Sequence, residues 1–248
     1  MKRIGVLGGM SPQATMDFEA RVHRAAQRLV PRDWNRGYPR MVVWYHRQLP
    51  VRLREDGRPI VPLQLDGELI EAAAWLGKAV DFLAIPCNAA HIGLAEITRA
   101  AGCPVLSMID VTLDDIVGRG GTRVGVLGFG AASPLYLEPL RRRGIHCETI
   151  DATAQTHLDA AIRAVMEGRD DKADAESARG AVGILRARGV QSVVLGCTEI
   201  PLLLGDEGEA ADLINPAALL AEAAVRFAMD PAQSRSRRLL TRGKSRCR

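Results

Sequence analysis

Two cysteines in matching surroundings are the residues of this sequence best suited to chemistry. Cys87 follows a short apolar run at 81–85 that Pro86 closes, and Cys197 follows another at 191–195 that Gly196 closes. Apolar runs of this length that end at Pro or Gly predict buried strands, so each thiol is expected just beyond a strand, where open α/β sheets bind ligands. Asn88 is expected to cap a helix that begins after Cys87, and such a helix N-terminus would favour a thiolate.

Two opposed thiols suit proton transfer at a carbon centre. One thiolate would remove a proton from one face of the carbon while the other thiol delivers a proton to the opposite face, which inverts a stereocentre. An ordinary thiol needs only a modest fall in pKa to act as a base near neutral pH, and convergent N–H donors would stabilise the carbanion. Pyridoxal phosphate usually does that work through a lysine Schiff base. None of the four lysines (Lys2, Lys78, Lys172 and Lys244) lies in a convincing strand-end loop, so a mechanism without a cofactor is expected.

The chain reads as a duplication of one α/β unit. The segment Val124-Gly125-Val126-Leu127-Gly128, followed by Ser133-Pro134, repeats the pattern of Ile4-Gly5-Val6-Leu7-Gly8 and Ser11-Pro12. Alternating strands and helices predict parallel sheets. We therefore expect two similar open-sheet domains, Rossmann-like or flavodoxin-like, related by a pseudo-twofold axis, with the active site in the cleft between them. The expected domains are residues 1–118 and 119–229, with the last helix free to pack back on the first domain.

Composition narrows the class of protein. With 248 residues, 47% apolar and 25% charged, the chain has a globular balance, and no apolar run approaches the roughly 20 residues that span a bilayer. The N-terminus leads directly into a strand, which predicts a cytoplasmic protein without membrane contact. Residues 230–248 form a basic tail that we expect to be disordered; without its seven cations the net charge of +4 becomes −3. Few, scattered aromatic residues argue against nucleic-acid binding.

The cysteine and tryptophan patterns carry less information. Five widely spaced cysteines, an odd number, do not predict a disulfide framework, and the lack of a Cys-x-x-Cys pair argues against a structural zinc site. Cys103 and Cys147 are expected in the core, and Cys247 lies in the tail. His91 is expected to orient the loop after Cys87. The tryptophans Trp34, Trp44 and Trp75 are expected to be core or interface residues.

Four motifs, in order, resemble those of the cofactor-independent aspartate/glutamate racemases, most closely the aspartate racemase branch. They are Gly8-Gly9-Met10-Ser11-Pro12-Gln13-Ala14-Thr15, Pro86-Cys87-Asn88-Ala89-Ala90-His91, Gly196-Cys197-Thr198-Glu199-Ile200 and Leu213-Ile214-Asn215-Pro216. The resemblance covers about residues 2–229. It implies an amino-acid substrate, no cofactor, a homodimer, and Cys87 and Cys197 as the acid/base pair, with Cys87 favoured for the D-isomer and Cys197 for the L-isomer.

The resemblance also implies a set of substrate-binding residues. Those near the α-carboxylate would be Met10, Ser11, Thr15, Asn88 and Thr198, while Arg52 would hold a side-chain carboxylate through its guanidinium fork. Glu199 would draw in the substrate ammonium or tune Cys197, or else serve only as a helix N-terminal carboxylate. The family pattern usually has Thr at Ala89, often has Asp at Val51 and Asn215, and includes a lysine for which Arg169 and Lys172 are approximate stand-ins. These departures leave aspartate, glutamate and other amino acids open as substrates.

Two alternatives remain beside a racemase. The first is another superfamily activity, such as that of a hydantoin racemase, a maleate isomerase or an arylmalonate-type decarboxylase. The decarboxylases need only one of the two cysteines, so the presence of both favours racemisation. The second is a two-lobed binding protein for amino acids or dicarboxylates, which has no need of thiols on both cleft walls.

Overall fold

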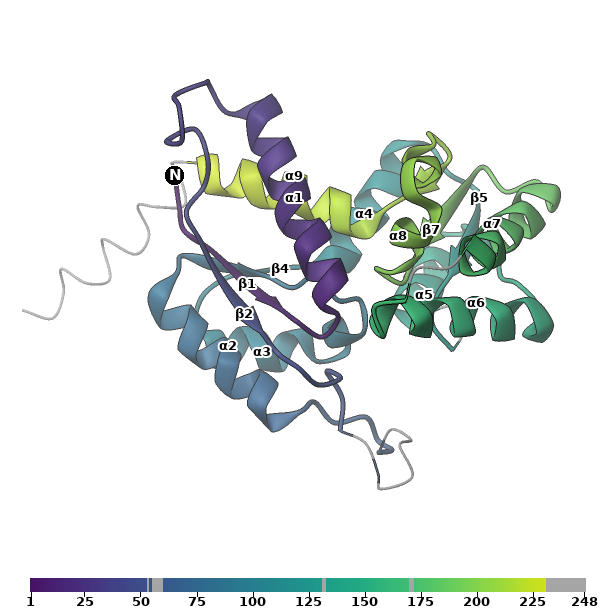
Figure 1. Ribbon diagram of the computed structural model, residues 1–248, viewed down its shortest axis with the longest axis horizontal. Coiled ribbons are helices and arrows are strands. Elements are labelled where there is room, and N and C mark those ends of the chain that lie inside the picture. Colours follow the sequence, from purple (N-terminus) through teal and green to yellow (C-terminus); the bar gives the residue numbers. More distant parts are fainter. Residues whose placement is uncertain (53, 55–59, 131–132, 170–171, 231–248) are drawn as a thin grey trace, which may run out of the picture.

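Two four-stranded parallel sheets organise the part of the chain that the computed structural model describes, which is residues 1–52, 54, 60–130, 133–169 and 172–230. The strand order is β2-β1-β3-β4 in the first sheet and β6-β5-β7-β8 in the second. The expected α/β fold of two similar open-sheet domains is thereby confirmed. We call the sheet β1–β4 with its helices the first lobe, and the sheet β5–β8 with its helices the second lobe (Figure 1). The basic tail, with Cys247, lies outside the described residues.

The elements alternate as the sequence predicts. The first half of the chain contains β1 (Ile4–Gly8), α1 (Pro12–Leu29), β2 (Met41–Tyr45), α2 (Gly67–Ala79), β3 (Phe82–Ala84), the 3-10 helix η1 (Ala89–Gly93), α3 (Leu94–Ala101), β4 (Val105–Leu106) and α4 (Met108–Gly118). The second half contains β5 (Arg123–Leu127), α5 (Pro134–Arg142), β6 (His146–Glu148), α6 (Ala152–Met166), α7 (Lys172–Ala187), β7 (Ser192–Leu195), α8 (Ile200–Leu204), the 3-10 helix η2 (Gly205–Glu209), β8 (Leu213–Ile214) and α9 (Pro216–Met229).

Side-chain caps determine where several helices begin. Ser11 accepts a hydrogen bond from the Ala14 N–H at the start of α1, and Ser133 accepts one from the Leu135 N–H at the start of α5. Both helices continue with a proline, whose fixed φ suits the first turn. The two lobes therefore start their first helix with the same Ser-Pro device, which supports the duplication read from the sequence.

Each sheet is covered by helices on both faces. In the first lobe, α1 and α9 pack against one face through residues such as Phe18 and Leu220, and α2 and α3 cover the other through residues such as Leu76 and Ile97. In the second lobe, α6 and α7 cover one face, and α4 and α5 the other. Because each sheet is covered on both faces, its central strands, such as β1, β3 and β7, are buried along their whole length rather than at alternate residues.

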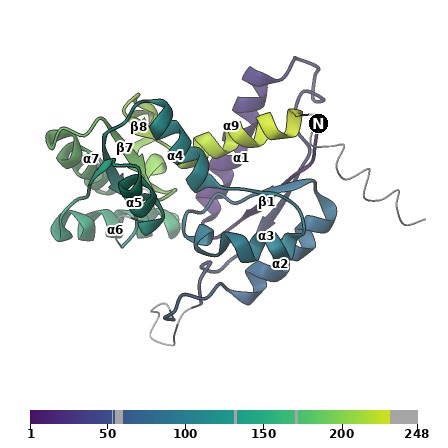
Figure 2. The ribbon, with the colours of Figure 1, turned by 180° about the vertical axis from the view of Figure 1, so that it is seen from behind.

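The helices at the ends of the two halves connect the lobes. α9 returns from the second lobe and lies beside α1 (Figures 1 and 2). α4 contributes Met108 to the core of the first lobe and Leu113 and Ile116 to the core of the second. Packing of these helices therefore holds the two sheets in one relative orientation. It thereby also positions the residues at the ends of the two sheets.

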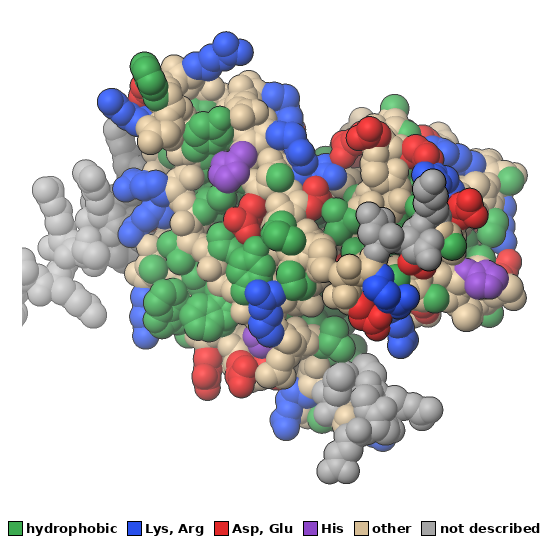
Figure 3. Space-filling model, viewed as in Figure 1, with side chains coloured by type: hydrophobic (Ala, Val, Ile, Leu, Met, Phe, Trp, Pro, Cys, Tyr) green, Lys and Arg blue, Asp and Glu red, His purple; other side chains and the backbone are tan. Residues whose placement is uncertain are grey.

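The tryptophans do not lie in the core. Trp34 is 93% exposed, Trp75 is 54% exposed and Trp44 is 38% exposed. The Trp44 and Trp75 rings lie 5.5 Å apart, on the edge strand β2 and on α2, where Figure 3 shows hydrophobic side chains at the surface. The core alternative for these residues is wrong, since all three side chains are exposed; the interface alternative and the homodimer stay predictions. Among the described residues, no helix combines the length and apolarity needed to cross a bilayer.

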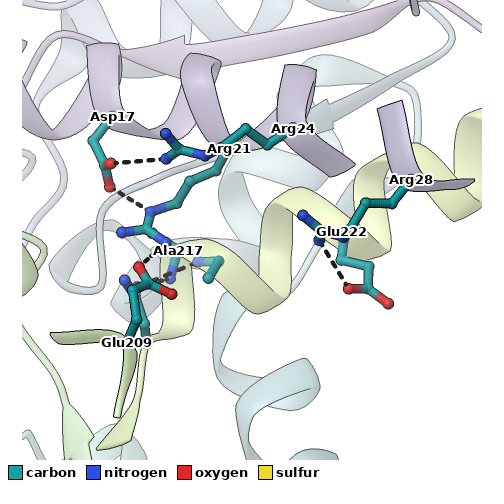
Figure 4. Close-up of polar contacts among 9 residues, drawn as sticks. Asp17, Arg21, Arg24, Arg28, Glu209, Ala217 and Glu222 are labelled. Atoms are coloured by element: carbon teal, nitrogen blue, oxygen red, sulfur yellow. Dashed lines mark hydrogen bonds and ion pairs between the residues drawn. The ribbon is translucent and has the colours of Figure 1, made fainter. Parts of the chain in front are cut away.

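An ion-pair bridge between α1 and η2 also joins the lobes (Figure 4). The Arg21 side chain is 11% exposed, donates to Asp17 at 2.6 Å within α1, and pairs with Glu209 of the second lobe at 2.8 Å. Replacing Arg21 with Ala is expected to lower the free energy of unfolding by about 1–3 kcal/mol, because the largely buried Asp17 carboxylate loses its partner. Chemical denaturation measures this loss. Arg24→Ala is the control, since Arg24 is 57% exposed and its ion pair with Asp17 is longer, at 3.7 Å. This change is expected to alter the free energy of unfolding by less than about 1 kcal/mol.

Candidate active site

Cys87 and Cys197 occupy equivalent positions in the two lobes. β1 aligns Val6 with Ala84 of β3, and β5 aligns Val126 with Val194 of β7. Each cysteine lies three residues beyond the aligned residue of its strand. Both thiols line one cavity of about 400 Å³ between the lobes. The structure therefore brings together, at the carboxyl ends of two equivalent strands, the two residues that the sequence singled out.

The loop after β3 holds Cys87 through backbone hydrogen bonds. The Cys87 N–H donates to the Ile85 carbonyl at 2.8 Å, and the Cys87 carbonyl lies 2.9 Å from Nδ1 of the buried His91. Nε2 of His91 accepts a hydrogen bond from the Met108 N–H at 2.9 Å, so Nδ1 carries the proton and donates to Cys87. Burial lowers the pKa of His91, which keeps the ring neutral in this role. The interpretation of His91 as an orienting residue is confirmed.

A buried carboxylate accompanies Cys197. The Cys197 thiol donates to Oε2 of Glu199 at 2.9 Å, and the Thr198 hydroxyl donates to the same oxygen at 3.2 Å. Glu199 is 1% exposed, and its second oxygen, Oε1, has no hydrogen-bond partner among the described residues. Gly196 permits the tight approach of this loop to β5, since a Cβ there would lie 2.3 Å from the Leu127 carbonyl oxygen. The cavity therefore has a carboxylate, that of Glu199, at one end, and one of its oxygens is free to accept a hydrogen bond from a ligand.

Both thiols have raised pKa values, which favours the protonated form at neutral pH. Burial raises the pKa of Cys87 to about 11, although the N–H groups of Ala89 and Ala90 lower it in part. Burial and the negative charge of Glu199 raise the pKa of Cys197 well above its ordinary value, and the charge of Cys87 adds to this. The N–H groups after Cys87 favour the thiolate as expected, but desolvation outweighs them and the net change in pKa is upward.

The glycine turn after β1 places Met10 and Ser11 on the cavity wall. Gly9 has a φ of +82°, and a Cβ there would lie 2.3 Å from the Tyr45 Cα, so only glycine lets the turn pass β2. The Thr15 hydroxyl accepts from the Gly9 N–H at 2.8 Å and donates to the Ser11 carbonyl at 3.0 Å. Thr15 does not line the cavity, because its hydroxyl is used to tie this turn to α1. Its expected contact with substrate therefore stays a prediction.

Asn88 lines the cavity but does not cap a helix. It immediately precedes η1 with helical backbone angles, and its side chain makes no capping bond. Instead Oδ1 accepts a hydrogen bond of 2.5 Å from the buried hydroxyl of Tyr136, on α5 of the other lobe. The Nδ2 group of Asn88 is buried without a partner in the described part of the chain. An amide N–H₂ of fixed orientation is thus available to a ligand in the cavity.

Arg52 is not part of this cavity. It lines a separate polar pocket and donates to Gln64 at 3.3 Å, because the bridge between Val51 and Leu65 directs this segment away from the thiols. Arg169, the other cation proposed for a side-chain carboxylate, is exposed and pairs with Glu167; the Lys172 side chain lies outside the described residues. Asn215 caps α9 rather than lining the cavity.

The remaining walls are mainly apolar. Among the expected residues Ala89 and Thr198 line the cavity, and so do residues that were not expected from the sequence: Leu49, Pro50, Ile92, Phe129, Ser133 and Met166. The glycine turn 128–130 and Ser133 could have been found from the duplication, since they correspond to the turn that carries Met10 and Ser11. No Arg or Lys occurs among the described lining residues.

The described residues offer a metal no obvious place beside the thiols. Among the described residues, one group of His, Cys, Asp and Glu side chains is close enough to share an ion. It consists of His46, Asp66 and Glu68. None of these three residues lines the cavity. The chemistry available at the cavity is therefore that of two thiols, a carboxylate and amide donors.

The arrangement of the two lobes is that of two-domain racemases. The aspartate racemase of Picrophilus torridus matches with a TM-score of 0.73 at 22% identity, over 92% of this chain and 94% of that one. An aspartate racemase homologue from Pyrococcus horikoshii matches with a TM-score of 0.72 at 21% identity, over 93% and 100%. At such identities the likeness shows the fold.

The chain belongs to the Asp/Glu/Hydantoin racemase family, whose model matches residues 7–224. A curated relative, the broad specificity amino-acid racemase RacX of Bacillus subtilis, is 34% identical over 114 residues. The matched stretch covers 46% of this chain and 48% of RacX, about half the length of each. The family agrees with the resemblance seen in the four sequence motifs.

Proposed function

We propose that the protein is an amino-acid racemase that works without a cofactor and uses Cys87 and Cys197 as a pair of opposed acid/base groups. The observation that carries the proposal is that both thiols, at equivalent positions of two like lobes, line one cavity of about 400 Å³. A binding protein has no use for this symmetry, whereas inversion of a stereocentre needs a proton donor and a proton acceptor on opposite sides of one carbon. Family membership supports the same reading.

In the proposed reaction, one cysteine as thiolate takes the α-proton, so that the Cα–H bond breaks and an S–H bond forms. The thiol of the other cysteine then gives its proton to the opposite face of the carbanion and becomes the thiolate. The reverse reaction uses the same groups with their roles exchanged. Racemisation thus needs one proton shared between the two thiols.

Glu199 would prepare the thiolate by binding the substrate ammonium. Its Oε1 is buried and unpartnered, while Oε2 accepts from the Cys197 thiol. The negative charge of Glu199 raises the pKa of both cysteines. A cationic ammonium beside this carboxylate would cancel much of that effect, so the thiols would become more acidic when an amino acid is bound. This accounts for how thiols that are protonated in the free protein could act as bases.

Asn88 would donate to the α-carboxylate through Nδ2, in an orientation set by Tyr136. Tyr136→Phe removes the hydroxyl that holds Oδ1 of Asn88, so the amide is free to turn. The expected result is a fall in kcat/KM of about tenfold, carried mainly by KM, since the carboxylate is bound in both ground and transition states. Steady-state racemisation kinetics measure the split between KM and kcat. A variant with unchanged KM would show that Tyr136 does not position Asn88 for substrate.

Two substrate classes remain. The resemblance favours aspartate or a near relative, with Arg52 as the expected partner of the side-chain carboxylate. The walls favour a neutral amino acid, because the described lining residues carry Met10, Leu49, Phe129 and Met166 but no cation. An unpaired carboxylate against apolar walls would cost free energy.

A panel of L-amino acids tests the proposal and separates these classes. The panel includes acidic, neutral and aliphatic side chains. We expect the enzyme to form the D-isomer of at least one member, as measured by chiral chromatography. Preference for aspartate and glutamate would assign Arg52 or a cation outside the described residues to the substrate. Preference for neutral members would assign specificity to the apolar wall. Inversion of none of them would contradict an amino-acid racemase.

A further inference from the structure

His46, Asp66 and Glu68 form a cluster apart from the thiols, and its geometry is that of an ion site. His46 directly follows β2, while Asp66 and Glu68 lie at the start of α2. One ligand atom of each lies within 4.8 Å of those of the other two. That spacing lets a single ion touch all three, since metal–ligand distances near 2 Å place neighbouring ligand atoms about 3–4 Å apart.

The cluster also contains an unsatisfied buried nitrogen. His46 is 3% exposed, and its Nε2 has no hydrogen-bond partner in the described part of the chain, although it lies 3.5 Å from Oδ1 of Asp66. The backbone holds the residue in place, because the His46 N–H donates to the Gly8 carbonyl at 2.8 Å. A buried polar atom without a partner points to a ligand that completes it. Here that atom belongs to an imidazole ring that offers a nitrogen ligand within 4.8 Å of two carboxylate oxygens, an arrangement that suits a cation.

The surroundings favour a cation as well. Asp66 and Glu68 also line a polar pocket that Glu71 and Glu96 share, so the approach to the cluster is acidic. The cation in that pocket, Arg52, donates to Gln64. Glu68 is further held by Gln48, whose amide donates to Oε2 at 3.2 Å. Carboxylate ligands of metals are commonly oriented by such neighbouring hydrogen bonds.

We propose that His46, Asp66 and Glu68 bind one divalent transition-metal ion of the zinc class. An imidazole nitrogen with two carboxylates suits zinc better than magnesium or calcium, which prefer oxygen ligands throughout, and three protein ligands leave one position for water. The ion joins the end of β2 to the start of α2. Leu49 and Pro50, which line the thiol cavity, follow His46 by three and four residues. We therefore assign the ion a structural role: it would hold the wall of the thiol cavity that Leu49 and Pro50 form, and it would take no part in the proton transfers.

Zinc titration of the full chain after removal of metal by a chelator tests this site. We expect one zinc ion per chain by isothermal titration calorimetry and a higher melting temperature with zinc. Glu68→Gln and His46→Asn are expected to weaken zinc binding by at least about tenfold. Glu176→Gln, the same change at an exposed position on α7 and outside the polar pocket beside the cluster, is the matched control and should bind zinc as the parent does. Glu68 is exposed, so its variant keeps the test valid if the buried His46 variant folds poorly.

Two results would overturn the site. One is the absence of zinc uptake by the parent protein. The other is uptake that Glu68→Gln and His46→Asn leave unchanged. Cobalt substitution identifies the donors independently: nitrogen and oxygen ligands give d–d absorption alone, whereas a sulfur-to-cobalt charge-transfer band would locate the ion at cysteines and contradict the proposal. Because neither readout depends on activity, failure of the metal site and failure of the racemase proposal can be distinguished.

Discussion

Cys87→Ser and Cys197→Ser are each expected to reduce racemisation by at least about 10²–10⁴-fold, to the limit of detection. A serine hydroxyl is a far weaker acid than a thiol, so it can neither take nor give the α-proton at the required rate. Both variants should fold, since serine is close in size to cysteine and both side chains border a cavity. Chiral chromatography of the product, in either direction of reaction, measures the loss.

Cys103→Ser is the control for these variants. Cys103 is 6% exposed in the core beside α2 and α3, and it does not line the cavity. Its replacement is expected to leave kcat within about twofold of the parent at a temperature where both are folded. Activity that survives in either the Cys87 or the Cys197 variant would rule out the two-thiol mechanism.

Glu199→Gln is expected to make both cavity thiols more acidic. The Glu199 charge raises the pKa of Cys87 and of Cys197, so its removal lowers both values and thiolate forms at lower pH. The rate of alkylation by iodoacetamide, followed at each cysteine by peptide mass spectrometry, should therefore rise at a lower pH than in the parent. The shift is expected to be larger at Cys197, since the buried Glu199 carboxylate accepts the hydrogen bond of that thiol.

The same variant separates the two roles of Glu199. If Glu199 also binds the substrate ammonium, KM rises even though the thiols are more readily ionised. Glu176→Gln, which removes an exposed carboxylate on α7, is the control and should leave the alkylation profile unchanged. An alkylation profile of Glu199→Gln that coincides with that of the parent, or lies at higher pH, would contradict the proposed electrostatic role.

The two halves and their cysteines could be predicted because their signals are local. A short apolar run closed by Pro86 or Gly196 marks the end of a strand, and the repeated glycine turns with Ser11 and Ser133 mark the start of each half. Parallel strands then bring their carboxyl ends to one edge without further information. The duplication predicts that Cys87 and Cys197 face each other in one cleft, and the resemblance to the family motifs implies the same pairing.

The rest depends on packing between segments far apart in the chain. The bond between Asn88 and Tyr136 crosses 48 residues and both lobes, so the capping pattern around Asn88 could not reveal it. The raised pKa of Cys87 follows from burial of the thiol. A helix start can be predicted from the sequence, but the degree of burial of the residue before it cannot. Arg52 was carried over from a motif, but its place is set by the pairing of Val51 with Leu65. The division at residues 118 and 119 stays a prediction, since α4 packs on both lobes.

The most direct test of the two-thiol racemase is α-proton exchange in deuterium oxide, followed by proton NMR with L- and D-aspartate, L- and D-glutamate and a neutral amino acid. We expect the parent protein to invert at least one of them, with deuterium at the α-carbon of the product, and both single serine variants to lose exchange and inversion together. Exchange that persists in both variants would place the base elsewhere. Binding of an amino acid by the parent without any α-deuterium would contradict the racemase and leave a binding protein.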